Sequence, residues 1–381
     1  MKILLACLAI ILPSAAIAAP VVHWNEGQAA RLIEWLEASR DDALSGGDQD
    51  AGQIRAAMAR SDQAQLDELA TASAIRLMRA HRDGCCNAAL RDGWHIDNGL
   101  SRIDIAQRVA DAVAADRIDE MFGQMRPRHP YYFALRAAYA SERDPERKAT
   151  LAANLDRWRW MPREFSGRYL LVNTAAFEAS LWQGQTELGS WQIIVGKTGS
   201  PTPIFSAKVT GVILNPWWEI PTSIVRESVG KLVATRPAEA ARRGYVVEEG
   251  RYRQRPGPNN ALGRMKLVMP NPYTVYLHDT PSQSLFARDV RTFSHGCVRV
   301  GDALGLAASL LSSMPQWDRK HVDAAVASGK TQTVSLPAPM PVYVAYFTAE
   351  PDGAGGVRYF PDVYKRDGNA TAPDDNGRCT Q

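Results

Sequence analysis

The chain has 381 residues, of which 45% are hydrophobic and 22% are charged, values typical of a globular protein with room for a buried core. Its 44 basic and 41 acidic residues leave a formal net charge of +3. This balance disfavours nucleic-acid binding, because nucleic-acid-binding domains concentrate basic residues on one face. The length predicts two or three structural units.

The first residues differ in kind from the rest of the chain. Lys2 precedes an apolar run from Ile3 to Ile17 that ends in small residues. These are the features of a secretory signal peptide, whereas a membrane anchor needs about 20 apolar residues to cross the bilayer core. We therefore expect residues 1–18 to be a cleaved signal peptide and the mature chain to be exported without a stable membrane anchor. The apolar run continues past Cys7, which disfavours a lipoprotein cleavage site there.

Four cysteines remain after the predicted cleavage: Cys85, Cys86, Cys297 and Cys379. Export makes disulfides chemically possible, but four cysteines in so long a chain are not a disulfide scaffold. The adjacent Cys85 and Cys86 can bond to each other only with strain. A bridge from one of them to Cys379 is conceivable, and the sequence does not decide the connectivity.

Residues 24–160 carry the pattern of a helical domain. Apolar residues recur at one-face spacing in the stretches 29–36 and 105–113. Asp144-Pro145 is a helix start, with a capping acid followed by proline in the first turn. The helix that follows has one face lined by Leu151, Leu155 and Trp158.

The pattern changes after Met161-Pro162. Short runs rich in β-branched and aromatic residues follow at 168–172, 176–182, 188–195, 209–214 and 273–277, and then, beyond a helix predicted at 302–313, at 331–336 and 342–347. Closely spaced runs of this kind predict an all-β sandwich or barrel. The fold class is therefore α+β, with an N-terminal all-helical domain followed by a mostly β, sandwich- or barrel-like domain.

An insertion of about residues 224–263 interrupts the predicted strands. Its first part, to Arg243, has a helical pattern and is strongly basic, and the run Arg255-Pro256-Gly257-Pro258 predicts a turn or an extended loop. An insertion of this size within a β domain is often a lid or a binding loop. The alternative that the sequence leaves open is a charged, solvent-exposed insertion without a binding role.

Candidate catalytic residues gather in two short stretches, Tyr276-Leu277-His278-Asp279 and Ser294-His295-Gly296-Cys297-Val298-Arg299. Cysteine is a nucleophile as the thiolate, and a pKa of about 8.5 leaves most of it protonated at neutral pH. An imidazole nearby removes that proton, and its positive charge then favours the thiolate. His278 closes a predicted strand, and the loop after it can return alongside Cys297.

His295 is only two residues from Cys297 and is better suited to shaping the loop. Gly296 suits a tight turn that aims backbone N–H groups at an oxyanion. Zinc also accepts the side chains of His278, Asp279, His295 and Cys297. Their spacing matches no Cys-x-x-Cys or His-x-x-x-His pattern, so we expect no metal. Spacing alone leaves open a buried structural cysteine with two hydrogen-bonded histidines.

A family resemblance favours catalysis. His278, fifteen intervening residues, then Ser294-His295-Gly296-Cys297 and Arg299 resemble the signature of the L,D-transpeptidase catalytic (YkuD-type) domain. The runs 215–221, 256–264 and 278–286 resemble its larger periplasmic YcbB-like branch, and the likeness spans about residues 158–367. Residues 24–157 resemble the helical scaffold region of that branch only loosely. No segment resembles the small peptidoglycan-binding module that many members carry.

The resemblance implies a helical scaffold domain at 24–160, a catalytic domain at 165–350 with a lid insertion at about 224–263, and a C-terminal extension and tail at 351–381. It implies a periplasmic peptidoglycan L,D-transpeptidase that needs no cofactor. Peptidoglycan stem peptides would be the substrates, and carbapenem β-lactams would be covalent inhibitors. Three alternatives stay open: an L,D-carboxypeptidase, an exchange or lipoprotein-tethering enzyme, and a catalytically dead wall-binding scaffold.

The resemblance also implies roles for individual residues. Cys297 attacks the third residue of a donor tetrapeptide stem and releases D-alanine, and His278 exchanges the protons. The thioester then passes to an acceptor amine, which gives a 3→3 cross-link. The Asp279 carbonyl orients the His278 ring, and the backbone N–H groups of His295, Gly296 and Cys297 form an oxyanion hole. The substrate-binding candidates are Ser294, Arg299, Tyr276 and Trp218, beside which Trp217 can also line the cleft.

For three of these candidates the sequence also leaves a structural role open. Arg299 can bind a substrate carboxylate through its planar guanidinium, or it can form a structural ion pair behind the loop. Tyr276 and Trp218 can line the cleft, yet aromatic residues on strands more often belong to the core.

Overall fold

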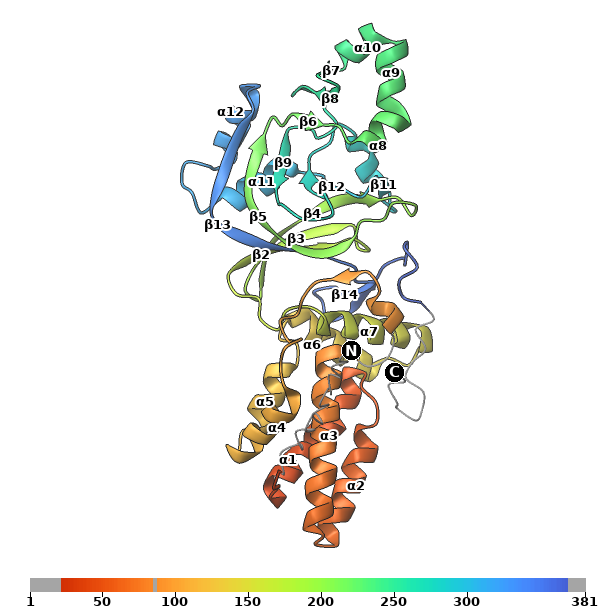
Figure 1. The fold of residues 1–381 in the computed structure, drawn as a ribbon, viewed down its shortest axis with the longest axis vertical. Coiled ribbons are helices and arrows are strands. Elements are labelled where there is room, and N and C mark those ends of the chain that lie inside the picture. Colours follow the sequence, from red (N-terminus) through yellow and green to blue (C-terminus); the bar gives the residue numbers. More distant parts are fainter. Residues whose placement is uncertain (1–21, 85–87, 369–381) are drawn as a thin grey trace, which may run out of the picture.

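The computed structural model describes residues 22–84 and 88–368, which form a helical part and a strand-rich part (Figure 1). The predictions for the signal peptide and for Cys7, Cys85, Cys86 and Cys379 lie outside the described residues. Within those two ranges, no helix combines the length and the apolar character that a membrane crossing requires.

The helical part consists of seven α-helices and three short elements between them. The helices are α1 (Glu26–Ala38), α2 (Gly47–Ala59), α3 (Gln63–Asp83), α4 (Ile105–Ala114), α5 (Ile118–Met125), α6 (Pro130–Ser141) and α7 (Pro145–Arg159), and the short elements are η1 (Ser39–Asp42), η2 (Ala88–Arg91) and β1 (Trp94–His95). The predicted apolar faces are buried, as at Leu32 and Val109. Asp144 caps α7 by accepting a hydrogen bond from the Arg147 N–H at 2.8 Å.

Two separate cores hold the helices. One lies within α1–α5, and the other joins α6 and α7 to the strand-rich part. In the second core the Trp158 ring of α7 stacks on Phe347 with their centroids 4.6 Å apart. The helical part is therefore attached to the strands through α6 and α7, as Figure 1 shows.

Ten strands form one sheet in the strand-rich part. Besides β1, they are β2 (Arg168–Asn173), β3 (Glu178–Gln183), β4 (Thr186–Gly196), β5 (Ile204–Leu214), β9 (Met265–Val268), β10 (Leu277–His278), β11 (Thr292–Ser294), β12 (Val298–Val300) and β13 (Gln332–Ala345). The order β5-β13-β2-β3-β4-β12-β10-β9 returns to β5 through the β5–β9 pairing, so these strands close into a barrel. The predicted α+β fold class, helical domain first and barrel-like domain second, is confirmed.

Two helices complete the barrel domain. Side chains of α11 (Ala303–Leu311) lie in the barrel core, and α12 (Arg319–Ala327) contributes Val322 to the same core. The chain then forms a two-stranded sheet of β14 (Ala349–Pro351) and β15 (Val357–Tyr359). A short 3-10 helix, η4 (Gln283–Ala287), lies between β10 and β11.

Two strand predictions need correction, and a third correction adds a strand that was not predicted. The runs 331–336 and 342–347 belong to one strand, β13, because both halves pair with β5 across an irregularity between Ser335 and Met340. The run 273–277 is strand only at Leu277, where β10 begins. The third correction concerns β9, a strand that the sequence analysis did not predict, although its pairing with β5 closes the barrel.

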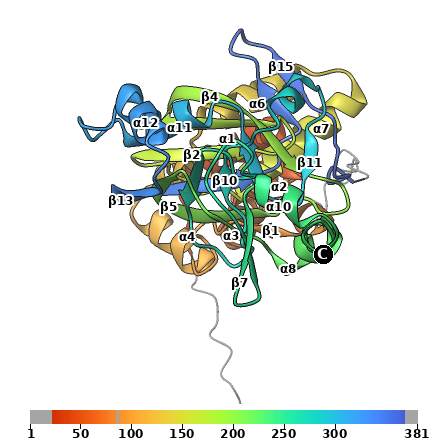
Figure 2. The same cartoon turned by 90° about the horizontal axis from the view of Figure 1, so that it is seen from above.

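The insertion has its own small fold. It contains α8 (Thr222–Ile224), the π-helical turn η3 (Val225–Val229), α9 (Gly230–Thr235), α10 (Pro237–Arg242), and a sheet of β6 (Trp218–Glu219), β8 (Arg251–Gln254) and β7 (Tyr245–Glu248). It lies at the end of the barrel away from the helical part, and Figure 2 views that end. Its core of Trp218, Ile220, Val229 and Leu262 packs against Tyr276.

Candidate active site

The pairing of two short strands brings the predicted catalytic residues together. In the parallel ladder of β10 and β12, Leu277 lies opposite Val298 and His278 lies opposite Arg299. Leu277 and Val298 are fully buried in the barrel core. Because side chains alternate along extended backbone, we infer that His278 and Cys297, the residue just before β12, project to the opposite face of this strand pair.

His278 is buried and its ring is held by its own neighbour. Nδ1 lies 2.5 Å from the Asp279 carbonyl oxygen. Since a carbonyl only accepts hydrogen bonds, Nδ1 carries the proton of the neutral ring. Burial lowers the pKa of His278 to about 3, the charges of Arg299 and Lys266 act in the same direction, and hydrogen bonds to the backbone of Asp279 and Leu262 act against it. The imidazole is therefore neutral at physiological pH.

Lys266, which the sequence analysis did not single out, lies beside this pair. It stands opposite His278 in the β9–β10 ladder, so two cations, Lys266 and Arg299, flank His278 on the neighbouring strands. Its Nζ lies 3.9 Å from the centroid of the Tyr276 ring. Met265 and Leu267 on either side are fully buried, so the alternation along β9 turns Lys266 to the face opposite the core.

The Cys297 thiol has opposing influences on its pKa. Burial raises the pKa, whereas a backbone and a side-chain hydrogen bond from Tyr276 and the charges of Lys266 and Arg299 lower it, and the net direction is upward. The thiol thus takes its hydrogen bonds from Tyr276 rather than from His278. Catalytic hydrogen bonds in substrate-free enzymes are often long and tighten when the substrate binds.

Tyr276 and Trp218 both reach the site. Burial and the neighbouring Cys297 raise the pKa of Tyr276, and a hydrogen bond from the Trp218 side chain acts in the opposite direction. The phenol therefore stays protonated and donates toward Cys297. The neighbouring Trp217 packs against the insertion, where Arg253 of β8 lies over its ring at 4.4 Å.

The carboxylate of Asp279 holds the C-terminal end of the insertion in place through a hydrogen bond. Its Oδ2 accepts a hydrogen bond from the Arg264 N–H at 2.8 Å. A Cβ added to Gly263 would come within 2.4 Å of that carboxylate, and Gly263 has φ of +61°. Asp279 thus fixes His278 through its carbonyl and the start of β9 through its side chain.

The loop before Cys297 uses Ser294 as an internal brace. Ser294 is buried, and its Oγ accepts from the Gly296 N–H at 3.1 Å and donates to the Cys297 carbonyl at 2.5 Å. Because both of these hydrogen bonds lie inside the loop, the structure favours a bracing role for Ser294, and its predicted contact with substrate stays a prediction. The Gly296 N–H is likewise unavailable to an oxyanion, whereas its φ of +111° fits the predicted loop-shaping role.

Of the three backbone N–H groups predicted to form the oxyanion hole, those of His295 and Cys297 are still available. Among residues 22–84 and 88–368, no partner accepts a hydrogen bond from the backbone N–H of His295 or of Cys297. The side chain of His295 is partly exposed, and its Nε2 lies 3.0 Å from Oε2 of Glu227 in the insertion. The insertion therefore contacts the nucleophile loop directly.

Arg299 forms no ion pair within the part of the chain that the structure describes. The structural ion pair considered for it is therefore not found, and the guanidinium lies close enough to Cys297 for the two charges to influence each other. In the same described ranges, no group of three or more His, Cys, Asp and Glu side chains is arranged to hold a metal ion.

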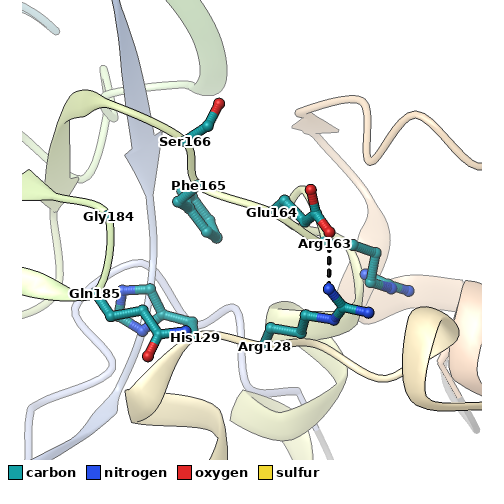
Figure 3. A pocket seen from close by; sticks show the side chains of 8 residues that line it. All are labelled: Arg128, His129, Arg163, Glu164, Phe165, Ser166, Gly184 and Gln185. Atoms are coloured by element: carbon teal, nitrogen blue, oxygen red, sulfur yellow. Dashed lines mark hydrogen bonds and ion pairs between the residues drawn. The ribbon is translucent and has the colours of Figure 1, made fainter. Parts of the chain in front are cut away.

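A pocket of about 240 Å³ lies at a different place, where the helical part meets the barrel (Figure 3). Its charged groups are already paired: Arg128 with Glu164 at 2.8 Å, and Arg163 with four backbone carbonyls. It is smaller than most ligand pockets, which span about 300–1,000 Å³. Its size and the pairing of its charged groups therefore favour a gap between the two parts over a ligand site.

Fold and site together define a β-barrel domain with a cysteine–histidine site, preceded by a helical domain. Residues 167–335 match the family described as the L,D-transpeptidase catalytic domain (YkuD), and residues 21–138 match a Scaffold domain. Residues 167–335 therefore form an L,D-transpeptidase catalytic domain of the YkuD family, and a Scaffold domain precedes it at residues 21–138.

One curated relative agrees with this assignment. A Haemophilus influenzae protein named "Putative L,D-transpeptidase" is 29% identical over 238 residues, which cover 57% of this chain and 48% of that protein. The match thus spans about half the length of that curated relative.

Solved structures similar to this chain include an L,D-transpeptidase from Mycobacterium smegmatis, with 14% identity, a TM-score of 0.27 and coverage of 47% of this chain and 59% of that one. L,D-transpeptidase 3 from Mycobacterium tuberculosis, in complex with a faropenem-derived adduct, has 14% identity, a TM-score of 0.26 and coverage of 47% and 60%.

Proposed function

We propose that the chain is a periplasmic peptidoglycan L,D-transpeptidase that works through a thioester on Cys297. The observation that carries the proposal is the placement of His278 and Cys297 on one face of two paired strands, within a domain that matches the L,D-transpeptidase family. A neutral imidazole beside a thiol is the arrangement that nucleophilic catalysis by cysteine requires.

The chemistry runs in two half-reactions. His278 takes the thiol proton, and Sγ attacks the carbonyl carbon of the third residue of a donor tetrapeptide stem. The C–N bond to D-alanine breaks, and the amine leaves with the proton that His278 returns. An acceptor amine then attacks the thioester, gives its proton to His278 and displaces the thiolate, which leaves a 3→3 cross-link.

Other parts of the site support this reaction. The N–H groups of His295 and Cys297 are the donors for the oxyanion. Arg299, which lacks an acidic partner in the described chain, is placed to bind a stem carboxylate. Tyr276 and Trp218 connect the nucleophile to the insertion, which we propose acts as a lid. The same thiolate would open the strained ring of a carbapenem and retain it as an acyl adduct.

Incubating the purified chain with tetrapeptide muropeptides and identifying the products by mass spectrometry tests this function. We expect 3→3 cross-linked dimers and released D-alanine, both lost in a Cys297→Ala variant. Tripeptide without dimer would indicate an L,D-carboxypeptidase. No turnover by well-folded protein would contradict the proposal.

The pH dependence of Cys297 reactivity follows from its surroundings. We expect alkylation by iodoacetamide to increase with pH with a midpoint above about 8.5, because burial raises the thiol pKa. His278, with a pKa of about 3, adds no titration between pH 5 and 8. Lys266→Met removes a charge that favours the thiolate, so the midpoint moves upward and the rate at pH 7 falls about 3–10-fold.

The exposed Lys208 of β5 supplies the control, since Lys208→Met should leave the profile unchanged. A wild-type midpoint near pH 6, or a Lys266→Met profile that matches the wild type, would contradict this description of the site.

The contact between Glu227 and His295 predicts a role for the insertion. Glu227→Gln weakens the contact that holds η3 over the nucleophile loop, so water reaches the thioester more easily. We expect the ratio of hydrolysis to cross-linking to rise about two- to fivefold, the range that an exposed ion pair of 0.2–1 kcal/mol allows. Glu239→Gln is the matched control, because Glu239 pairs with Arg236 and Arg243 of the insertion itself. An unchanged ratio of products in Glu227→Gln would argue against the lid.

A further inference from the structure

Thr202 lies directly behind the nucleophile loop, in the short segment that joins β4 to β5. It is fully buried. Its Oγ1 accepts a hydrogen bond from the Gly196 N–H at 2.9 Å and donates one to the Gly296 carbonyl, also at 2.9 Å. The single hydroxyl therefore connects the end of β4 to the residue that precedes Cys297.

The direction of one peptide group follows from this contact. The Gly296 carbonyl and the Cys297 N–H belong to the same planar peptide unit, and in a trans peptide they point in opposite directions. No peptide bond in the described chain is cis. With its carbonyl held by Thr202, this unit turns the Cys297 N–H away from the β4–β5 segment, on the side where no described group accepts it.

The neighbouring peptide is held in the same way. The Ser294 carbonyl accepts a hydrogen bond from the Lys197 N–H at 2.9 Å, so the His295 N–H also points away from the β4–β5 segment. Two carbonyls of the nucleophile loop are thus bound by one segment, residues 196–202. The two N–H groups that stay open belong to these two peptide units.

The segment is rigid enough to hold this geometry. Pro201 and Pro203 flank Thr202 and restrict the backbone on both sides. The Tyr364 hydroxyl donates to the Gly196 carbonyl at 2.6 Å. A Cβ on Gly196 would lie within 2.2 Å of the Ser200 carbonyl oxygen, which shows how tightly the turn closes.

We propose that Thr202 is the positioning residue of the oxyanion hole: by holding the Gly296 carbonyl, it aims the Cys297 N–H at the oxygen that becomes negative during acyl transfer. This inference rests on the proposed function, because an oxyanion forms only if Cys297 is acylated. The role of Thr202 is one of positioning, because its hydroxyl binds the Gly296 carbonyl and so acts through the Gly296–Cys297 peptide.

The reactivity of the thiol itself is set by other groups. Burial raises the pKa of Cys297, whereas Tyr276, Lys266 and Arg299 lower it. The Thr202 hydroxyl instead forms its hydrogen bonds with Gly196 and Gly296. Alkylation by iodoacetamide forms a thioether without building an oxyanion, whereas acylation by a carbapenem builds one. Alkylation therefore measures the nucleophilicity of the thiolate alone, whereas acylation also depends on the direction of the N–H groups.

The test compares Thr202→Val, which keeps the shape and removes the hydroxyl, with Thr202→Ser, which keeps the hydroxyl. For the full chain, acylation by a carbapenem and alkylation by iodoacetamide are both followed by intact mass. Loss of one oxyanion-hole donor costs about 10²–10³-fold. A misdirected donor retains part of its effect, so we expect Thr202→Val to slow acylation about 10–100-fold while alkylation stays within about twofold. Thr202→Ser should remain within about threefold of the wild type in both reactions.

Equal slowing of both reactions in Thr202→Val, or no slowing of acylation, would overturn the inference while leaving the proposed function intact. A wild-type protein that is alkylated but never acylated would refute the proposed function and the inference with it. If Thr202→Val does not fold, Thr202→Ala replaces it, and the same separation of the two rates is required.

Discussion

Replacing His278 with alanine is expected to lower the rate at which a carbapenem acylates Cys297 by about 10²–10⁴-fold, the usual contribution of a positioned general base. The thiol pKa is raised by burial, so little thiolate exists at neutral pH without a base to remove the proton. His278 is neutral at that pH and lies on the same strand face as Cys297. It is therefore the group able to accept the proton during attack.

Acylation rates from intact mass, with circular dichroism to verify folding, provide the measurement. His295→Ala is the matched control, since its partly exposed side chain contacts Glu227 and Lys197 rather than the thiol. We expect that variant to remain within about tenfold of the wild type. The hydrogen bonds of Cys297 to Tyr276 make the outcome decisive: a His278→Ala variant that is acylated nearly as fast as the wild type would assign proton removal to Tyr276 or to water.

Replacing Asp42 with asparagine is expected to lower the free energy of unfolding by about 3–5 kcal/mol, the usual cost of removing one partner from a buried ion pair. Asp42, in η1, is fully buried. Its carboxylate binds Arg126 at 2.7 Å, Arg136 at 3.1 Å and the Tyr132 hydroxyl at 2.8 Å. Without the negative charge, two guanidinium groups lose their buried counter-ion.

Urea unfolding of Asp42→Asn beside Asp323→Asn measures this effect. Asp323 pairs with Arg319 on the exposed face of α12, where an ion pair contributes less than about 1 kcal/mol. A similar loss of unfolding free energy in the two variants would show that the buried ion pairs of Asp42 do not stabilise the helical part more than an exposed ion pair does.

Local patterns predicted those features that depend on neighbouring residues in the chain. The Asp144 cap and the buried face of α7 follow from helix-start chemistry and from 3.6-residue spacing, and both are present. The strand preceding Asp279 also followed from local composition, although only Leu277–His278 proved to be strand. The family signature then identified His278 and Cys297 as the residues to examine.

Features that depend on strand pairing could not be predicted in the same way. β9 has only four residues, and its role in closing the barrel comes from contacts with β5 that are distant in sequence. Lys266 enters the site through that pairing, so its importance was not visible from the chain alone. For the same reason the sequence predicted β13 as two strands, because its two halves are joined only by their common pairing with β5.

Hydrogen bonds within the nucleophile loop were also outside the reach of sequence reasoning. Ser294 looks like a substrate-binding hydroxyl when only the motif is considered. In the structure its donor and its acceptor are both used by Gly296 and Cys297. Only the three-dimensional arrangement shows which N–H groups remain open to an oxyanion.

The measurement that tests the central claim most directly is the intact mass of the purified protein after incubation with a carbapenem, beside a Cys297→Ala control. The proposed function predicts a gain of one drug mass in the wild type and none in the control. A well-folded wild-type protein that gains no mass would contradict an activated nucleophile at Cys297, and the chain would then be better described as a wall-binding scaffold with an inactive catalytic domain.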